Sequence, residues 1–290
     1  MRNTAIIVVL FAAVLGSLII IIGNIFIIFV FWKNRNRLKR TSFLLINLAV
    51  ADLLVGFTGL ISFGAFNIPG HFKDQSFNSA DITNISEVLQ ITFSFASVFF
   101  LTLISLERAY ALIWPLRHRI ASSKYYIFSA MFAWVAAIFF GAVTLLIVYD
   151  ILDLSYGMVG FGCSVVLCLV TICVSYLAIR KRLDCRFPAI DESHNRRTER
   201  QQNAKLSRTL FLVITASLLF WIPSIVVYTT HYLCFQCVPL LIFQIFNVFR
   251  LANSLVNPII YSFKIPIFKE IFKRTKVCKR SKQYTVNCMV

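Results

Sequence analysis

The stretch Asn-Ser-Leu-Val-Asn-Pro-Ile-Ile-Tyr, residues 253–261, lies inside the last of seven long apolar segments of this chain. Amides and hydroxyls find no water in hydrocarbon, so Asn253, Ser254 and Asn257 must face the interior of a helix bundle. Pro258 cannot donate a helical N–H, so we expect the helix to kink or loosen there. The stretch therefore predicts a membrane-spanning helix with a polar, deformable interior.

The composition is that of a membrane protein. Of the 290 residues, 59% are hydrophobic and 14% are charged, and the mean hydropathy is +0.78. The apolar blocks are long enough to cross ~30 Å of hydrocarbon, and the alternating pattern of a transmembrane barrel is absent. We predict an all-α membrane protein, a seven-transmembrane helix bundle that forms a single domain over 1–290. The predicted spans are 5–32, 43–66, 82–113, 125–149, 157–179, 209–233 and 238–263, followed by a cytoplasmic segment at 264–290.

The positive charges are placed unevenly along the chain, whose net charge is +17. The first, third and fifth loops and the tail are basic, with nine Lys or Arg residues over 180–208 and eight from Lys264 onward. The second, fourth and sixth loops together contain one Lys or Arg residue, Lys73. By the positive-inside rule the N-terminus is extracellular and the C-terminus is cytoplasmic. Basic residues beside helix ends favour contact with anionic membrane lipid, and we expect no nucleic-acid partner.

Two of the eight cysteines, Cys234 and Cys237, fall in a predicted extracellular loop. No second pair of metal ligands accompanies this C-x-x-C spacing, so a local disulfide is favoured over zinc.

Polar residues form stripes on two of the predicted spans. Spacings of three and four residues place each stripe on one helical face. For a single Ser or Asn two readings stay open, a functional site or an interhelical hydrogen bond of about 0.6 kcal/mol. The stripes are Glu87, Gln90, Ser94 and Ser97 on the third span, and Gln244, Asn247, Arg250, Ser254, Asn257 and Tyr261 on the seventh.

Two charged residues inside the spans require compensation. Asp52, a lone carboxylate in the second span, is costly unless it is neutral, paired or bound to a small cation such as Na⁺. Arg250 either forms an internal salt bridge with Glu87 or serves as the counter-ion of an anionic ligand. We favour the internal pair slightly.

With these residues in place, the chain resembles the rhodopsin-like (class A) G-protein-coupled receptors over nearly its whole length. A motif of that family matches almost every span. The matches are Gly23-Asn24, the string around Asp52, Glu107-Arg108-Ala109 with Pro115, Trp134, Phe220-Trp221-Ile222-Pro223, Asn257-Pro258-Ile259-Ile260-Tyr261, and Phe268 in a short amphipathic C-terminal helix.

The resemblance implies a plasma-membrane receptor and no enzyme. A ligand settles among the outer halves of the helices, the sixth helix swings outward near Pro223, and a heterotrimeric G protein is activated. The implied ligand-binding positions are Glu87, Gln90, Ser94, Trp221, Tyr228, Asn247, Arg250 and Leu251. The implied coupling and switch positions are Glu107, Arg108, Tyr176, Pro223, Pro258 and Tyr261. The implied allosteric sodium site comprises Asp52, Ser97, Asn253, Ser254 and Asn257, with Trp221 beside it, and no other cofactor is expected.

The ligand class is narrowed by two positions. Gln90 stands where receptors for biogenic amines carry an aspartate, so we expect a non-aminergic ligand. Leu251 stands where opsins carry the retinal-linking lysine, which excludes light sensing by a Schiff base. The Cys234–Cys237 loop looks like that of adenosine receptors. Thr83 in place of the usual helix-three cysteine and the short second extracellular loop look like the melanocortin branch.

Departures from the family pattern predict signalling without ligand. Three positions lack the residue that the family pattern has there. Ser217 replaces a phenylalanine of the packing switch, Asn203 replaces an acid that pairs with the helix-three arginine in some members, and Ala109 replaces a tyrosine. A receptor that is constitutively active and binds no diffusible ligand is one alternative. The other is a seven-helix transporter or channel in which Asp52 and Arg250 line a permeation path. An intramembrane hydrolase is disfavoured, because no paired carboxylates or Ser–His arrangement lie at membrane depth.

Overall fold

The computed structural model describes residues 2–33, 41–65, 79–184, 212, 215–217, 219–230, 233–234 and 237–264. Almost all of them are helical, and no strand occurs within these ranges. Residues 219–230 form a further helical segment between α7 and α9. The labelled helices are α1 (Arg2–Lys33), α3 (Thr41–Ala65), α4 (Ser79–Ile113), α5 (Pro115–Ile120), α6 (Ser123–Val148), α7 (Leu154–Asp184) and α9 (Leu240–Lys264).

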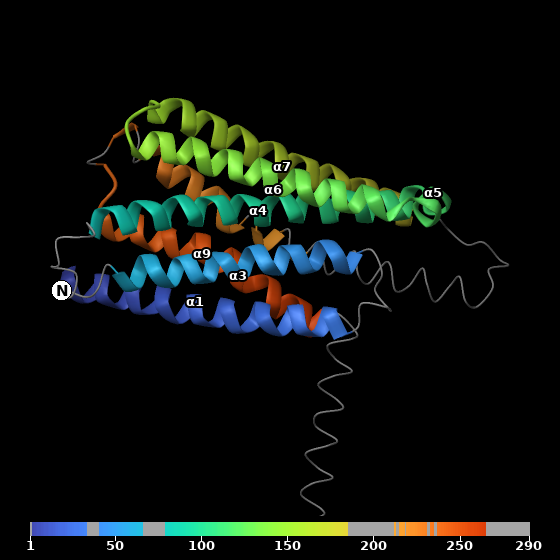
Figure 1. Cartoon of the computed structure of the whole chain (residues 1–290), viewed down its shortest axis with the longest axis horizontal. Coiled ribbons are helices and arrows are strands. Elements are labelled where there is room, and N and C mark those ends of the chain that lie inside the picture. The colour runs from blue at the N-terminus through green and yellow to red at the C-terminus, as the bar shows by residue number, and fades with distance from the viewer. Residues whose placement is uncertain are drawn as a thin grey trace, which may run out of the picture.

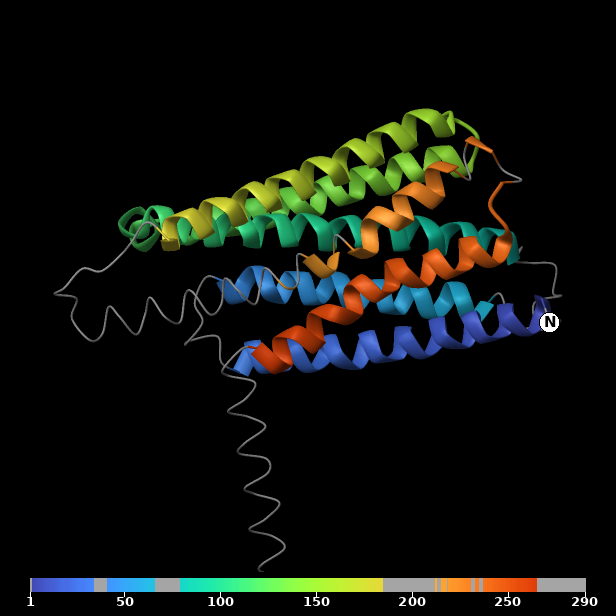
Figure 2. The same ribbon diagram turned by 180° about the vertical axis from the view of Figure 1, so that it is seen from behind.

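The long helices lie side by side and alternate in direction along the bundle (Figures 1 and 2). One end of the bundle holds the α6–α7 connection and the start of α9, and we call it the Cys234 end. The opposite end holds α5 and the last turn of α4, and we call it the Arg108 end. The basic loops of the sequence follow α1, α4 and α7, and all three helices finish at the Arg108 end (Figure 1).

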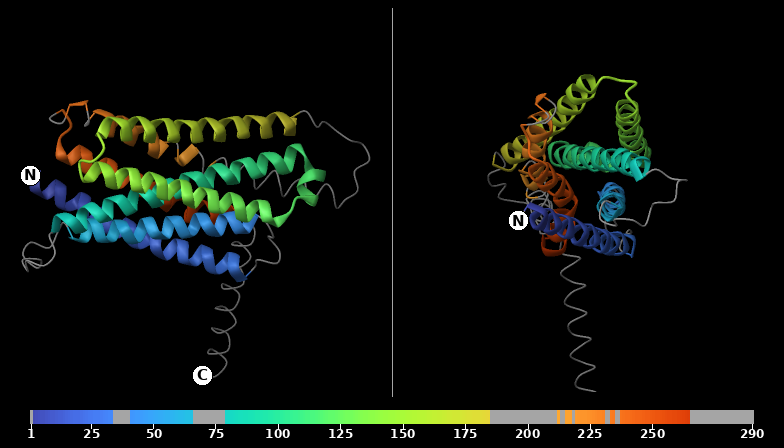
Figure 3. Two further views of the ribbon diagram at one scale, coloured as in Figure 1. Left: turned by 45° about the horizontal axis from the view of Figure 1, so that its top comes forward. Right: turned by 90° about the vertical axis from the view of Figure 1, so that its left-hand side faces the viewer.

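Helix α4 lies at the centre of the bundle. It packs against α3 on one side and against α6 and α7 on another, while α1 packs against α3 and α9. The end-on view in Figure 3 shows α4 enclosed by its neighbours. This placement explains why α4 and α3 bury most of their side chains, whereas α1, α6 and α7 expose broad apolar faces such as Phe11, Phe132 and Leu167. Those faces are suited to acyl chains.

Five of the described helices, α1, α3, α4, α6 and α7, are long and apolar enough to cross a membrane. Helix α9 is also 25 residues long. It carries the polar stripe that the sequence showed, and it continues through Pro258. The segment Thr215–Thr230 is a shorter apolar helix.

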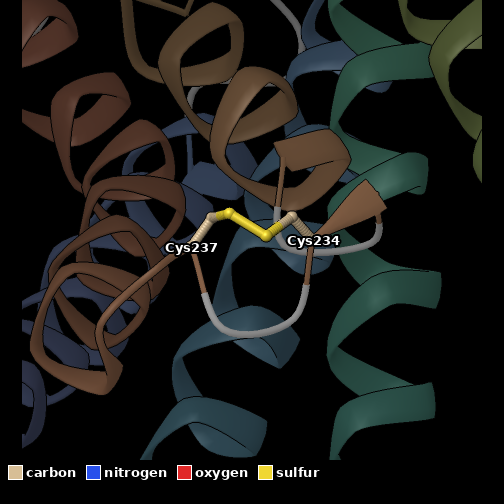
Figure 4. Close-up of a disulfide and its surroundings, with 2 residues drawn as sticks. All are labelled: Cys234 and Cys237. Atoms are coloured by element: carbon tan, nitrogen blue, oxygen red, sulfur yellow. A yellow bond between two sulfur atoms is a disulfide. The ribbon is translucent and has the colours of Figure 1, made fainter.

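The two connections described at the Cys234 end are short. Between α6 and α7, Asp153 accepts hydrogen bonds from the Ser155 backbone N–H at 2.7 Å and from its hydroxyl at 2.5 Å, which starts α7. Between the segment 219–230 and α9, a disulfide joins Cys234 and Cys237, whose Cα atoms are 5.3 Å apart (Figure 4). The predicted local disulfide is therefore confirmed.

Some expectations fall outside the described residues. They concern Asn203, the C-terminal helix with Phe268, and the side chains of Thr83 and Tyr261.

Candidate functional site

A buried polar cluster forms around Asp52, which is fully inaccessible. Ser97 of α4 and Ser254 of α9 each donate to Asp52 Oδ1 at 2.7 Å. Asn257 Nδ2 donates to Asp52 Oδ2 at 2.6 Å. The carboxylate of α3 thus joins the polar stripes of α4 and α9, at the depth where hydrocarbon surrounds the bundle.

Oxygen atoms predominate among the polar groups buried on these helices. The side-chain carbonyl oxygens of Asn24, Asn253 and Asn257 are buried and have no hydrogen-bond partner in the described part of the chain. The Asp52 carboxylate and the two hydroxyls bonded to it are oxygen ligands of the kind that hard cations such as Na⁺ prefer. The residues predicted for sodium, Asp52, Ser97, Ser254, Asn253 and Asn257, are all buried.

A second site is a cavity of about 250 Å³ toward the Cys234 end, which we call the Trp221 cavity. Four elements, α4, α6, α7 and the segment 219–230, form its walls, and α9 contributes one side chain. Its aromatic wall is compact, since the Phe95 ring centroid lies 5.5 Å from that of Phe161 and 6.3 Å from that of Trp221. Lining residues include Glu87, Ser94, Phe95, Thr144, Ile147, Phe161, Val165, Trp221, Ser224, Tyr228 and Arg250.

Among the described side chains of α9, Arg250 alone lines this cavity, and its contacts differ from the favoured expectation. Its Nη2 donates to Gln90 Oε1 at 3.0 Å, and its guanidinium carbon lies 5.8 Å from the Tyr228 ring centroid. Within the described residues, no carboxylate forms an ion pair with Arg250. The internal salt bridge with Glu87 is therefore absent here, because Gln90, one turn further along α4, meets the guanidinium instead.

Three other predicted ligand-binding residues, Gln90, Asn247 and Leu251, are not among the residues that line the cavity. Gln90 is 2% exposed and holds Arg250. Asn247 accepts a hydrogen bond from the Tyr228 hydroxyl and so links α9 to the segment 219–230. Leu251 packs with Leu10 and other apolar residues and is not among the lining residues.

The Arg108 end contains a buried ion pair. Arg108 Nε lies 2.5 Å from Glu107 Oε2, and both residues are 7% exposed. The other carboxylate oxygen lies 3.0 Å from His118 Nε2 of α5, which in turn lies 3.2 Å from the Tyr126 hydroxyl of α6. Glu107 of α4 is therefore linked through His118 of α5 to Tyr126 of α6. Of the remaining predicted switch residues, Tyr176 is half-buried on α7, and Pro223 and Pro258 lie within helical segments.

The sequence did not single out the apolar part of the cavity. Phe95, Phe161, Ile147 and Val165 were not predicted as site residues. An apolar residue in an apolar span is equally compatible with facing lipid, the protein core or a cavity. Its residue type therefore does not indicate which of the three it faces. Of these four residues, only Phe95 was indirectly indicated by the sequence, because it is adjacent to the predicted site residue Ser94.

The all-α arrangement of the described helices, with its buried polar cluster around Asp52 and its buried Glu107–Arg108 pair, is consistent with a seven-transmembrane receptor bundle. In agreement, the profile of the family described as "7 transmembrane receptor (rhodopsin family)" matches residues 23–261. The chain belongs to this rhodopsin family. It is accordingly a multi-pass plasma-membrane receptor and not an enzyme.

Individual relatives are distant. The G-protein coupled estrogen receptor 1 of Mus musculus is 27% identical, over 86% of this chain and 69% of the relative. The adenosine receptor A3 of Canis lupus familiaris is 26% identical, over 92% of this chain and 91% of the relative. The octopamine receptor beta-2R of Chilo suppressalis is 23% identical, over 96% of this chain and 80% of the relative. An adenosine receptor is thus among the relatives, as the loop resemblance indicated, but their names refer to chemically different ligands.

Proposed function

We propose that this receptor binds a small, non-aminergic extracellular ligand in the Trp221 cavity and activates a heterotrimeric G protein at its Arg108 end. The observation that carries the proposal is that α4 bears both sites. Glu87, Ser94 and Phe95 lie on the cavity, and the Glu107–Arg108 pair lies at the other end of the same helix. At 1.5 Å per residue, Glu87 and Arg108 are about 30 Å apart, close to the thickness of the hydrocarbon core.

In this proposal the Cys234 end is extracellular and the Arg108 end is cytoplasmic. The support is the positive-inside rule applied to the loops and tail that follow Lys33, Ile113, Asp184 and Lys264. An epitope tag before Met1 should bind antibody on intact cells, and a tag after Val290 only after permeabilisation. The reverse pattern would overturn the orientation and place the Trp221 cavity inside the cell.

Signal transfer would proceed through the segment 219–230. Trp221 lies on the cavity wall and is 8% exposed, so a ligand beside it changes its packing against Phe95. Pro223, two residues further along, lacks the N–H of a regular helical turn and gives the segment a point of bending. A ligand with higher affinity for the outward-bent state shifts the equilibrium toward that state. Arg108, Tyr176 and Tyr261 would then face the G protein.

The Asp52 cluster would hold a sodium ion in the resting receptor. Asp52, Ser97 and Ser254 would bind it, with Asn253 and Asn257 close by, and the ion would supply the positive charge that the buried carboxylate lacks. Because three helices contribute these residues, an ion there would favour the packing in which α3, α4 and α9 stay together.

The test is nucleotide exchange on G proteins in membranes that contain the receptor. Membranes with wild-type chain, with Arg108→Ala and with no receptor are compared, first unstimulated and then with adenosine, lipid and peptide panels. We expect exchange above the empty membranes in the wild type, and loss of that signal in Arg108→Ala at equal surface expression. If no G protein responds under any condition despite surface expression, the proposal fails and ion-flux measurements become the next step.

A further inference from the structure

Two residues that line the Trp221 cavity, Trp221 and Arg250, each carry a buried hydrogen-bond donor without a partner in the described part of the chain. These donors are Trp221 Nε1 and Arg250 Nε. Gln90 Nε2 is also unpartnered within the described residues, but it lies on the α3 side, 3.6 Å from where a Cβ on Gly59 would stand. The orientation of the Gln90 amide follows from its neighbour, because Oε1 accepts from Arg250 Nη2 and the NH₂ group must point elsewhere. A buried donor without an acceptor costs free energy, so the donors of Trp221 and Arg250 favour an occupant that carries hydrogen-bond acceptors.

The charge balance points the same way. Arg250 is permanently protonated, and its described contacts are a neutral amide and an aromatic face. The carboxylates described nearby do not neutralise it, because Glu87, on the same cavity, is exposed and forms no ion pair with it. Arg250 is half-buried, so part of the hydration of its guanidinium is lost, and a bound anion would offset that cost.

The rest of the cavity restricts the size and character of such an occupant. Its volume of about 250 Å³ lies below the roughly 300–1,000 Å³ typical of pockets for drug-sized ligands. Phe95 offers a flat apolar surface, and its ring centroid lies 5.5 Å from that of Phe161 and 6.3 Å from that of Trp221. This aromatic wall suits one small ring or a short acyl chain.

From these observations we infer that the receptor's ligand is a small acid, whose carboxylate or phosphate binds Arg250 while its apolar body packs against Phe95 and Trp221. The inference rests on the proposed function only in taking the Trp221 cavity as the ligand site. Gln90 is a positioning residue, since its Oε1 accepts a hydrogen bond from Arg250 Nη2 and so orients the guanidinium.

Direct binding to purified receptor in detergent tests the inference without any G protein. The probes are benzoate and phenyl phosphate, with benzamide as the neutral analogue and benzylamine as the cationic one, all at the same millimolar concentration and ionic strength. The readout is the apparent unfolding temperature. We expect one or both acids to raise it above the value in benzamide, whereas benzylamine does not, and the responding acid identifies the preferred anionic group.

Three variants assign the effect to Arg250. Arg250→Gln removes the charge, and we expect roughly ten- to a hundredfold weaker acid binding, as for loss of a charged hydrogen-bond partner. Arg250→Lys keeps the charge and should retain part of the binding. Arg182→Gln, on the exposed end of α7, removes the same charge elsewhere and should bind like the wild type.

Two results would overturn the inference. One is equal stabilisation of the wild type by the acids and by benzamide, a comparison that needs no variant to fold. The other is an acid effect of the same size in Arg250→Gln. Nucleotide exchange on G proteins is measured separately, so a receptor that binds acids without activating a G protein contradicts the proposed coupling and leaves this inference standing.

Discussion

Gly23 of α1 and Pro258 of α9 lie in direct contact. A Cβ atom built on Gly23 would stand 2.9 Å from Pro258 Cβ and 3.0 Å from Pro258 Cγ. Two helices from opposite ends of the sequence therefore meet where α9 lacks one helical N–H, and the missing Cβ is what permits the approach. This contact places Asn257, and through it the Asp52 cluster, at a fixed distance from α1.

Substitution of Gly23 should therefore destabilise the receptor. In Gly23→Ala, the added Cβ meets the rigid Pro258 ring, and overpacking of this kind costs about 1–3 kcal/mol. We expect a lower apparent unfolding temperature in detergent and less receptor at the cell surface. Gly16→Ala on the same helix is the matched control, because nothing lies within 4 Å of its added Cβ. If both variants lose the same stability, the contact with Pro258 is not the cause.

The Asp52 cluster predicts a sodium-dependent stability. Wild-type receptor should unfold at a higher temperature in NaCl than in choline chloride of equal ionic strength, because an ion bound only by the folded state stabilises it. In Asp52→Asn we expect that difference to disappear, since the neutral amide removes the charge that attracts the cation.

Asp153→Asn is the charge-matched control for this experiment. Asp153 is exposed in the α6–α7 connection, and the hydrogen bonds from the Ser155 side chain and backbone lower its pKa below the usual value. It is therefore ionised at neutral pH, and its removal deletes one negative charge far from the cluster. A sodium response retained in Asp52→Asn, or lost in Asp153→Asn, would contradict the assignment of the site.

The Glu107–Arg108 pair predicts how ligand-free signalling can be raised. Glu107→Gln removes the charge that holds Arg108, so a larger share of receptors should adopt the G-protein-binding state. We expect a several-fold increase in nucleotide exchange without ligand. His118→Ala should give a smaller increase, because the 2.5 Å pair between Glu107 and Arg108 stays in place. Exchange in Glu107→Gln at or below the wild-type level would mean that the pair does not restrain the receptor.

The polar parts of these sites could be predicted from sequence, because hydrocarbon makes every polar residue conspicuous. Asp52, Ser97, Ser254 and Asn257 stand out in apolar spans, and helical spacing assigns the last three to inward faces before any contact is known. The structure brings all four together in a single hydrogen-bonded cluster.

The partner of Arg250 could not be predicted in this way. Glu87 and Gln90 share one face of α4 and differ by about one turn, or ~5 Å along the axis. Which of them meets Arg250 depends on how far α4 and α9 are shifted along each other. That shift depends on how each helix packs against all of its neighbours. For α9, one such contact is that of Pro258 with Gly23 of α1. No single spacing in the sequence encodes the result.

A polar link between α3 and α6 gives the last prediction. Trp134 Nε1 donates to Asn47 Oδ1 at 3.1 Å, and the Trp134 ring meets Phe100 edge-on with centroids 5.6 Å apart. Trp134→Phe keeps an aromatic ring but removes the donor, so we expect a loss of about 1 kcal/mol. Asn47→Ala removes the acceptor and also the bond from Asn47 Nδ2 to the Phe43 carbonyl at 2.9 Å, so it should cost at least as much. Because both substitutions delete the same hydrogen bond, the double variant should lose less stability than the sum of the two single variants. Strictly additive losses in the unfolding temperature would show that the bond contributes nothing and that Trp134 acts through packing alone.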